Sequence, residues 1–167
     1  MPRWKLLPLV PMLLALFAAP GCAGEAQVEK LFGGAEAVGV VNEATTVEAF
    51  RLPTGSFFQE SPEKYTMTSG PVAVSAATAE KLRAALLDPK TYGWDFAKGC
   101  EPDFGVRIRF TKGKETVDVF FCFGCDILAV YFNGKRTGDE DFDDARPAFV
   151  AAAKALFPKD EAIQGLE

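Results

Sequence analysis

Hydrophobic and polar residues alternate most regularly in the stretch 100–134. Val106, Ile108 and Phe110 alternate with arginines, which is the period of two typical of a half-buried β-strand. A polar, glycine-containing segment at 111–114 follows and has the composition of a turn. The pattern therefore predicts a strand that enters a β-hairpin.

The second strand of this hairpin is more apolar than the first. Val117, Val119 and Phe121 alternate again, but Phe120 and Cys122 are also apolar. A strand with two apolar faces is typical of the middle of a sheet, where both faces are covered. We expect this strand to be central.

A third strand is predicted at 127–132, closed by the turn signal Asn133-Gly134. Shorter strands are expected within 47–52 and 65–74, and amphipathic helices at about 76–87 and 145–157. Together these elements predict a small α+β domain. Its antiparallel sheet would have four to six strands, with the two helices mainly on one face.

Three cysteines flank these strands, and the strand geometry limits how they pair. Cys122 and Cys125 lie too far apart to bond along a straight strand, unless the chain bends at Gly124 in a tight turn or a bulge. If the hairpin pairs residue 111 with 116, Cys100 falls near the same end of the sheet. All three thiols are therefore expected to converge there.

Three interpretations of these thiols remain open. Cysteines of exported proteins tend to pair, so a structural disulfide is the leading one. A metal site is the alternative, in which Cys100, Cys122 and Cys125 bind zinc or copper. Its fourth ligand would be Asp126, Glu101, Asp103 or water. Thiol–disulfide exchange is the third, although the Cys-x-x-Cys sequence lies between strands and not at a helix N-terminus.

The N-terminus has the pattern of a secretory signal peptide. A short positive start is followed by about fourteen apolar residues, too few to span a bilayer as a helix, and then by small residues. Residues 1–22 are accordingly interpreted as a signal peptide, 23–46 as a tether with one short helical turn, and 47–167 as a single domain.

The end of this leader, Ala19-Pro20-Gly21-Cys22, resembles a bacterial lipobox, in which the cysteine becomes the lipid-bearing first residue. Gly21 and Cys22 match the pattern, whereas Pro20 is atypical. Cys22 is thus the candidate lipidation site, and cleavage after Ala23 is the alternative. The resemblance implies a membrane anchor and a location in the cell envelope, in the periplasm or on the outer surface.

Composition excludes several functions. The chain carries a net charge of −5, which argues against nucleic acid as a partner. It contains no histidine, the commonest general base and metal ligand, and no Gly-x-Ser-x-Gly or phosphate-loop motif. Tyr92, Trp94 and Phe96 are expected to cover an edge of the core, with an exposed aromatic binding platform as the alternative.

The cysteine-containing segments resemble a widespread set of uncharacterised exported bacterial proteins. The resemblance covers roughly 47–166. It rests on the run Lys98-Gly99-Cys100-x-Pro102-x-Phe104-Gly105-Val106, on Cys-Phe-x-Cys-Asp from Cys122, and on Phe142-Asp143 and Leu156-Phe157-Pro158. It implies export and no particular activity. From the leader and the absence of catalytic signatures, we expect a non-catalytic envelope protein, held at the membrane by lipid, that binds another protein or a small ligand.

Overall fold

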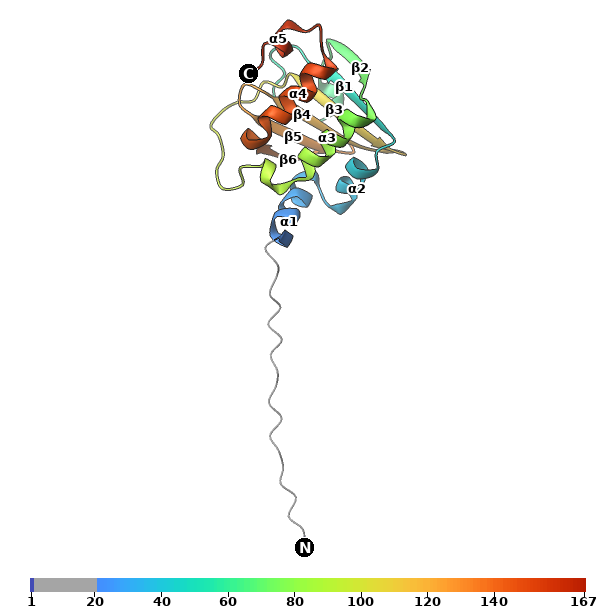
Figure 1. Cartoon of the computed structure of the whole chain (residues 1–167), viewed down its shortest axis with the longest axis vertical. Helices are drawn as coiled ribbons and strands as arrows, with labels where there is room; N and C mark the ends of the chain where they lie inside the picture. The colour runs from blue at the N-terminus through green and yellow to red at the C-terminus, as the bar shows by residue number, and fades with distance from the viewer. Residues whose placement is uncertain (2–20) are drawn as a thin grey trace.

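A six-stranded antiparallel sheet forms the centre of the structure (Figure 1). The computed structural model describes Met1 and residues 21–167. The strands are β1 (Thr46–Arg51), β2 (Ser69–Ala73), β3 (Val106–Lys112), β4 (Glu115–Cys122), β5 (Ile127–Phe132) and β6 (Lys135–Asp141). Their order in the sheet is β2-β1-β3-β4-β5-β6, so β3 and β4 are central. The central place of β4 is the one that its two apolar faces predict.

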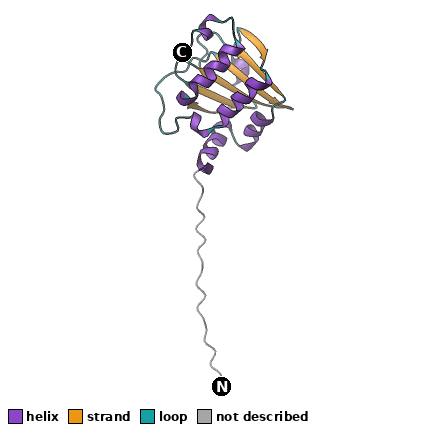
Figure 2. Ribbon diagram, in the orientation of Figure 1, coloured by secondary structure: helices purple, strands orange, loops and turns teal. Residues whose placement is uncertain are grey.

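Five α-helices are described, and the two predicted from amphipathicity lie across one face of the sheet (Figure 2). The helices are α1 (Gly21–Phe32), α2 (Ala35–Glu43), α3 (Ala76–Leu87), α4 (Arg146–Leu156) and α5 (Glu161–Gln164). Three short 3₁₀ turns lie in the connections: η1 (Pro62–Lys64), η2 (Pro89–Thr91) and η3 (Asp143–Ala145). The predicted α+β class is confirmed.

Alternation along the strands divides the buried residues between two faces. Phe110, Val119 and Leu128 belong to the larger cluster, which packs against the helices. Phe120 and Tyr131 point to the opposite face. There they pack with residues from the loops: Leu52, Tyr65 and Phe104. The predicted hairpin register is also confirmed, because Thr111 pairs with Thr116.

The segment predicted as a tether is instead folded onto the domain. Val28, Phe32, Val40 and Val41 of α1 and α2 are buried in the helix-facing cluster. The glycines at 33–34 do interrupt a long helix, with positive φ angles of 99° and 117°. They produce two short helices whose apolar residues then pack on the sheet, which is why the prediction of a tether was wrong.

The sequence pattern also missed β6. This strand, KRTGDED, has no apolar residue and pairs with β5 at the edge of the sheet. Edge strands are often polar because one side of their backbone is not covered by another strand. The 3₁₀ turn at Asp143–Ala145 follows β6, and α4 then begins without any side-chain cap.

Residues 2–20 of the predicted leader lie outside the described residues, as does the side chain of the candidate lipidation site, Cys22. Within residues 21–167, no helix has both the length and the apolar character required to span a membrane.

We predict that Phe32→Ala lowers the free energy of unfolding by about 3–5 kcal/mol, because it removes a fully buried aromatic ring. Urea denaturation followed by circular dichroism measures the change. Lys30→Ala, on the exposed side of the same helix, serves as the matched control and should change it by less than about 0.5 kcal/mol. Equal stability of the two variants would mean that α1 is not part of the folded domain.

Candidate functional site

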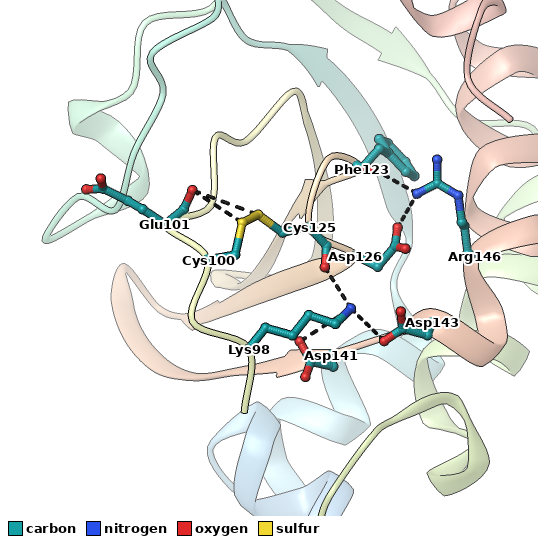
Figure 3. The surroundings of a disulfide bond; sticks show 9 residues. All are labelled: Lys98, Cys100, Glu101, Phe123, Cys125, Asp126, Asp141, Asp143 and Arg146. Atoms are coloured by element: carbon teal, nitrogen blue, oxygen red, sulfur yellow. Dashed lines mark hydrogen bonds and ion pairs between the residues drawn. A yellow bond between two sulfur atoms is a disulfide. The ribbon is translucent and has the colours of Figure 1, made fainter. Parts of the chain in front are cut away.

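Cys100 and Cys125 form a disulfide that fastens the loop before β3 to the turn between β4 and β5 (Figure 3). Their Cα atoms lie 6.3 Å apart, within the usual range for a disulfide. The bond closes a loop with a sequence separation of 25 residues. Both sulfur atoms lie 3.9 Å from the carbonyl oxygen of Glu101.

The bend between the two strands differs from both predicted forms. Cys122 pairs with Ile127, so the turn comprises the four residues 123–126. Asp126 takes the left-handed conformation, with φ of 55°, whereas Gly124 does not. This turn moves Cys125 out of the strand and toward Cys100.

Of the three cysteines expected to converge, the structure therefore joins two. Cys122 is buried and unbonded, and it packs in the cluster with Phe120 and Tyr131. Cys125 packs against the edge of the same cluster. Sequence reasoning located the correct end of the sheet but did not distinguish the paired cysteines from the third one.

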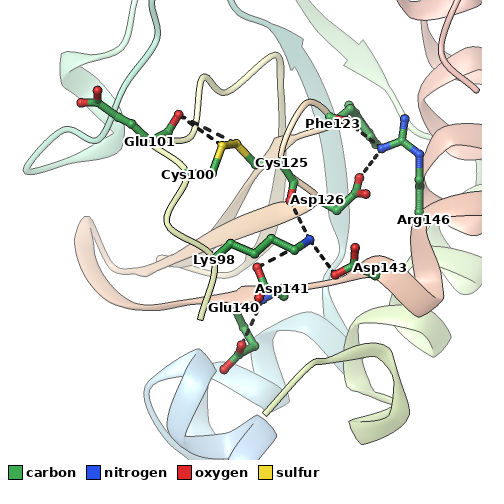
Figure 4. Close-up of polar contacts among 10 residues, drawn as sticks. All are labelled: Lys98, Cys100, Glu101, Phe123, Cys125, Asp126, Glu140, Asp141, Asp143 and Arg146. Carbon is green, nitrogen blue, oxygen red and sulfur yellow. Dashed lines mark hydrogen bonds and ion pairs between the residues drawn. A yellow bond between two sulfur atoms is a disulfide. The ribbon is translucent and has the colours of Figure 1, made fainter. Parts of the chain in front are cut away.

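Lys98 forms the polar centre beside the disulfide (Figure 4). Its Nζ donates to the carbonyl oxygen of Cys125 at 2.7 Å and lies 2.6 Å from a carboxylate oxygen of Asp143. It is also 3.8 Å from Oδ1 of Asp141, whose side chain is 3% exposed. We call these five residues, Lys98, Cys100, Cys125, Asp141 and Asp143, the disulfide corner.

A second ion pair supports the turn from the side of α4. Arg146, the first residue of that helix, pairs with Asp126 and donates to the carbonyl oxygen of Phe123 at 2.7 Å. The left-handed conformation of Asp126 and the position of Cys125 are thus held from both sides, by Arg146 and by Lys98.

The structure does not bring the residues predicted as metal ligands together as one set. Cys100 and Cys125 are bonded to each other, Cys122 is in the core, and Asp126 is paired with Arg146. Within the described chain, no group of three or more His, Cys, Asp or Glu side chains is placed to hold a metal ion. The other ligand candidates are separate, since Asp103 accepts hydrogen bonds from backbone amides at 55 and 56.

Carboxylates accumulate along β6 at this corner. Burial raises the pKa of Asp141, and the nearby Asp143, Asp126 and Asp139 raise it further, while Lys98 opposes the rise. Burial likewise raises the pKa of Glu140, with Asp141 and Asp139 as neighbours. Each of these two side chains therefore releases its proton less readily in the folded protein than in the unfolded chain.

Lys98 and Asp141 are the residues that sequence reasoning missed here. Lys98 stands two positions before Cys100, at the start of the run that carries the resemblance, but no role was predicted for it. Asp141 lies in the unpredicted strand β6, so nothing in the pattern indicated that it would be buried.

We predict that Cys100→Ser lowers the free energy of unfolding by about 3 kcal/mol, because the disulfide restricts the unfolded chain. Reductant should lower the stability of the parent equally and leave this variant unchanged. Intact mass of the parent should rise by two hydrogen atoms on reduction. Cys122→Ala removes the unbonded thiol of Cys122, and its stability should still fall when reductant is added. If reductant no longer lowered the stability of Cys122→Ala, the pairing of Cys100 with Cys125 would be contradicted.

Asp141→Asn should become more stable relative to the parent as the pH rises from acid toward neutral. The raised pKa means that the folded parent binds the proton more tightly than the unfolded chain does, so ionisation of Asp141 costs the parent stability. Asparagine carries no such charge. Urea titrations of both proteins across the acid range measure the difference, and a constant or shrinking difference would contradict the raised pKa.

No protein-family model, no curated protein and no solved structure matches this chain. The function is therefore inferred below from the residues and their geometry.

Proposed function

We propose that the protein is an exported domain of the cell envelope, anchored by lipid at Cys22, that binds a ligand or partner without chemical turnover. The observation that carries this proposal is the Cys100–Cys125 disulfide. Disulfides persist in oxidising compartments outside the cytoplasm and are rare within it. The leader at 1–22 supports the same location.

The place of the disulfide supports a structural role for it. Cys100 lies in a loop and Cys125 in a turn between strands, whereas exchange-active cysteines sit at helix N-termini that lower the thiol pKa. The bond holds the loop 92–105, whose Phe104 is fully buried beneath the sheet. A loop fixed in this way is a rigid support for binding residues.

Two features support binding over catalysis. The chain has no histidine to act as a general base. Asp143 of the disulfide corner is engaged with Lys98, and the neighbouring Asp126 is engaged with Arg146. A fixed set of charges around a closed loop can recognise a charged ligand, and it needs no movement to do so.

The lipid anchor is tested by expressing the full chain in bacteria with an alkyne analogue of palmitate. We expect the label on the parent and on Cys122→Ala, and no label on Cys22→Ala. Label that persists on Cys22→Ala would remove the anchor from the proposal. Recovery of the parent in the cytoplasm with a free Cys100 thiol would contradict export.

A further inference from the structure

A cleft of about 430 Å³ opens beside the disulfide corner, between the segment 94–98 and β6. This volume is within the range of small-molecule sites. Aromatic side chains of Trp94 and Phe96 form part of its lining, and Asp139, Glu140 and Asp141 contribute from β6. We call it the acidic cleft.

Asp141 is a residue of the cleft whose hydrogen bonding is incomplete. Its side chain is 97% buried, and its Oδ2 atom has no hydrogen-bond partner in the part of the chain that the structure describes. A buried carboxylate oxygen without a donor costs free energy. Lys98 does not supply this donor, because its ammonium group is closer to Asp143 and to the carbonyl oxygen of Cys125.

The charges around the cleft favour a cation. Asp95, Asp139, Glu140 and Asp141 line it, against the single positive charge of Lys98. Arg136 lies 3.6 Å from Asp139 and balances that carboxylate in part. The excess of negative charge is consistent with the raised pKa values of Glu140 and Asp141.

The aromatic residues make the cleft suited to a cation that also has a hydrocarbon part. Phe96 is 57% exposed, an unusual position for a phenyl ring in a chain that buries most of its aromatics. The Trp94 ring is fixed by a 2.8 Å hydrogen bond from Nε1 to the carbonyl oxygen of Pro89. Aromatic faces beside carboxylates are how proteins recognise ammonium groups.

We propose that the acidic cleft binds an organic ammonium ion. Its N–H groups face Asp141, and its alkyl part lies against Phe96. The proposal deepens the binding role proposed above, on which it rests, by naming the class of ligand. A metal ion is a poorer occupant, since the described acidic residues form no group of three or more placed to hold one.

The test uses the full chain with Trp4→Phe, which leaves Trp94 as the only tryptophan. Butylammonium chloride is titrated against sodium chloride at equal ionic strength, with Trp94 fluorescence as the readout. We expect a saturable change. Asp141→Asn should weaken binding by about tenfold or more, because it replaces a charged acceptor by a neutral amide.

Phe96→Ala is the second variant and should weaken binding roughly two- to fivefold through loss of the cation–π contact. Its ring is exposed, so the fold does not depend on it, and the test stands even if Asp141→Asn fails to fold. Glu80→Gln on α3 removes a charge elsewhere and is the matched control that should leave binding unchanged.

Three results would overturn the proposal. The first is a fluorescence titration that shows no saturable change, and the second is an affinity for butylammonium that is the same in the parent, in Asp141→Asn and in Phe96→Ala. The third is a fluorescence change with magnesium chloride, at matched ionic strength, as large as the change with butylammonium chloride. Binding should also weaken as acid protonates Asp141 and Glu140, in the field of Lys98, Asp139 and Asp143. Failure here leaves the palmitate result at Cys22 untouched, so the two proposals fail separately.

Discussion

Asp118 lies in the central strand β4 with its side chain fully buried, and two arginines of β3 hold its charge. Arg107 Nε is 2.7 Å from Asp118 Oδ1, and Arg109 contacts both carboxylate oxygens, at 2.8 and 3.1 Å. Arg109 also reaches Glu63, in the segment that covers this face. Removing one partner from a buried ion pair leaves an uncompensated charge, which is strongly destabilising.

This set of ion pairs constrains the register between β3 and β4. A slip of one residue would turn Arg107 toward the helices and separate it from Asp118, while moving the apolar residues to the wrong face. The same register fixes how far the chain runs from Val106 back to Cys100. The meeting of Cys100 with Cys125, and hence the position of Lys98, follows from pairings made in the middle of the sheet.

The parts of the structure that could be predicted are those where local pattern and burial agree. Alternation located β3 and β4, the apolar segment before Asn133-Gly134 located β5, and amphipathic spacing located α3, whose N-cap Ser75 accepts a hydrogen bond from the backbone amide of Thr78. The strand β6 could not be found, because a polar edge strand has no apolar period. Residues 23–43 were misread because glycines indicate where helices end but not whether the helices pack.

The candidate site likewise has one part that the sequence predicts and another that depends on the complete fold. The end of the sheet that holds the cysteines follows from strand register, which local sequence specifies. The contacts of Lys98 with Asp143 and Cys125 join segments distant in the sequence, so they depend on the complete fold. The four-residue turn at 123–126 could not be predicted either, because residues other than glycine seldom adopt the left-handed conformation that Asp126 has in this turn.

The packing of α1 limits the distance between Cys22 and the folded domain. From Cys22 to the buried Val28 the helix rises only about 9 Å, and no spacer separates the two. An acyl chain at Cys22 would therefore hold the domain flush with the bilayer surface, with restricted tilt. With the proposed anchor, the protein would sample only molecules in the thin layer next to the membrane.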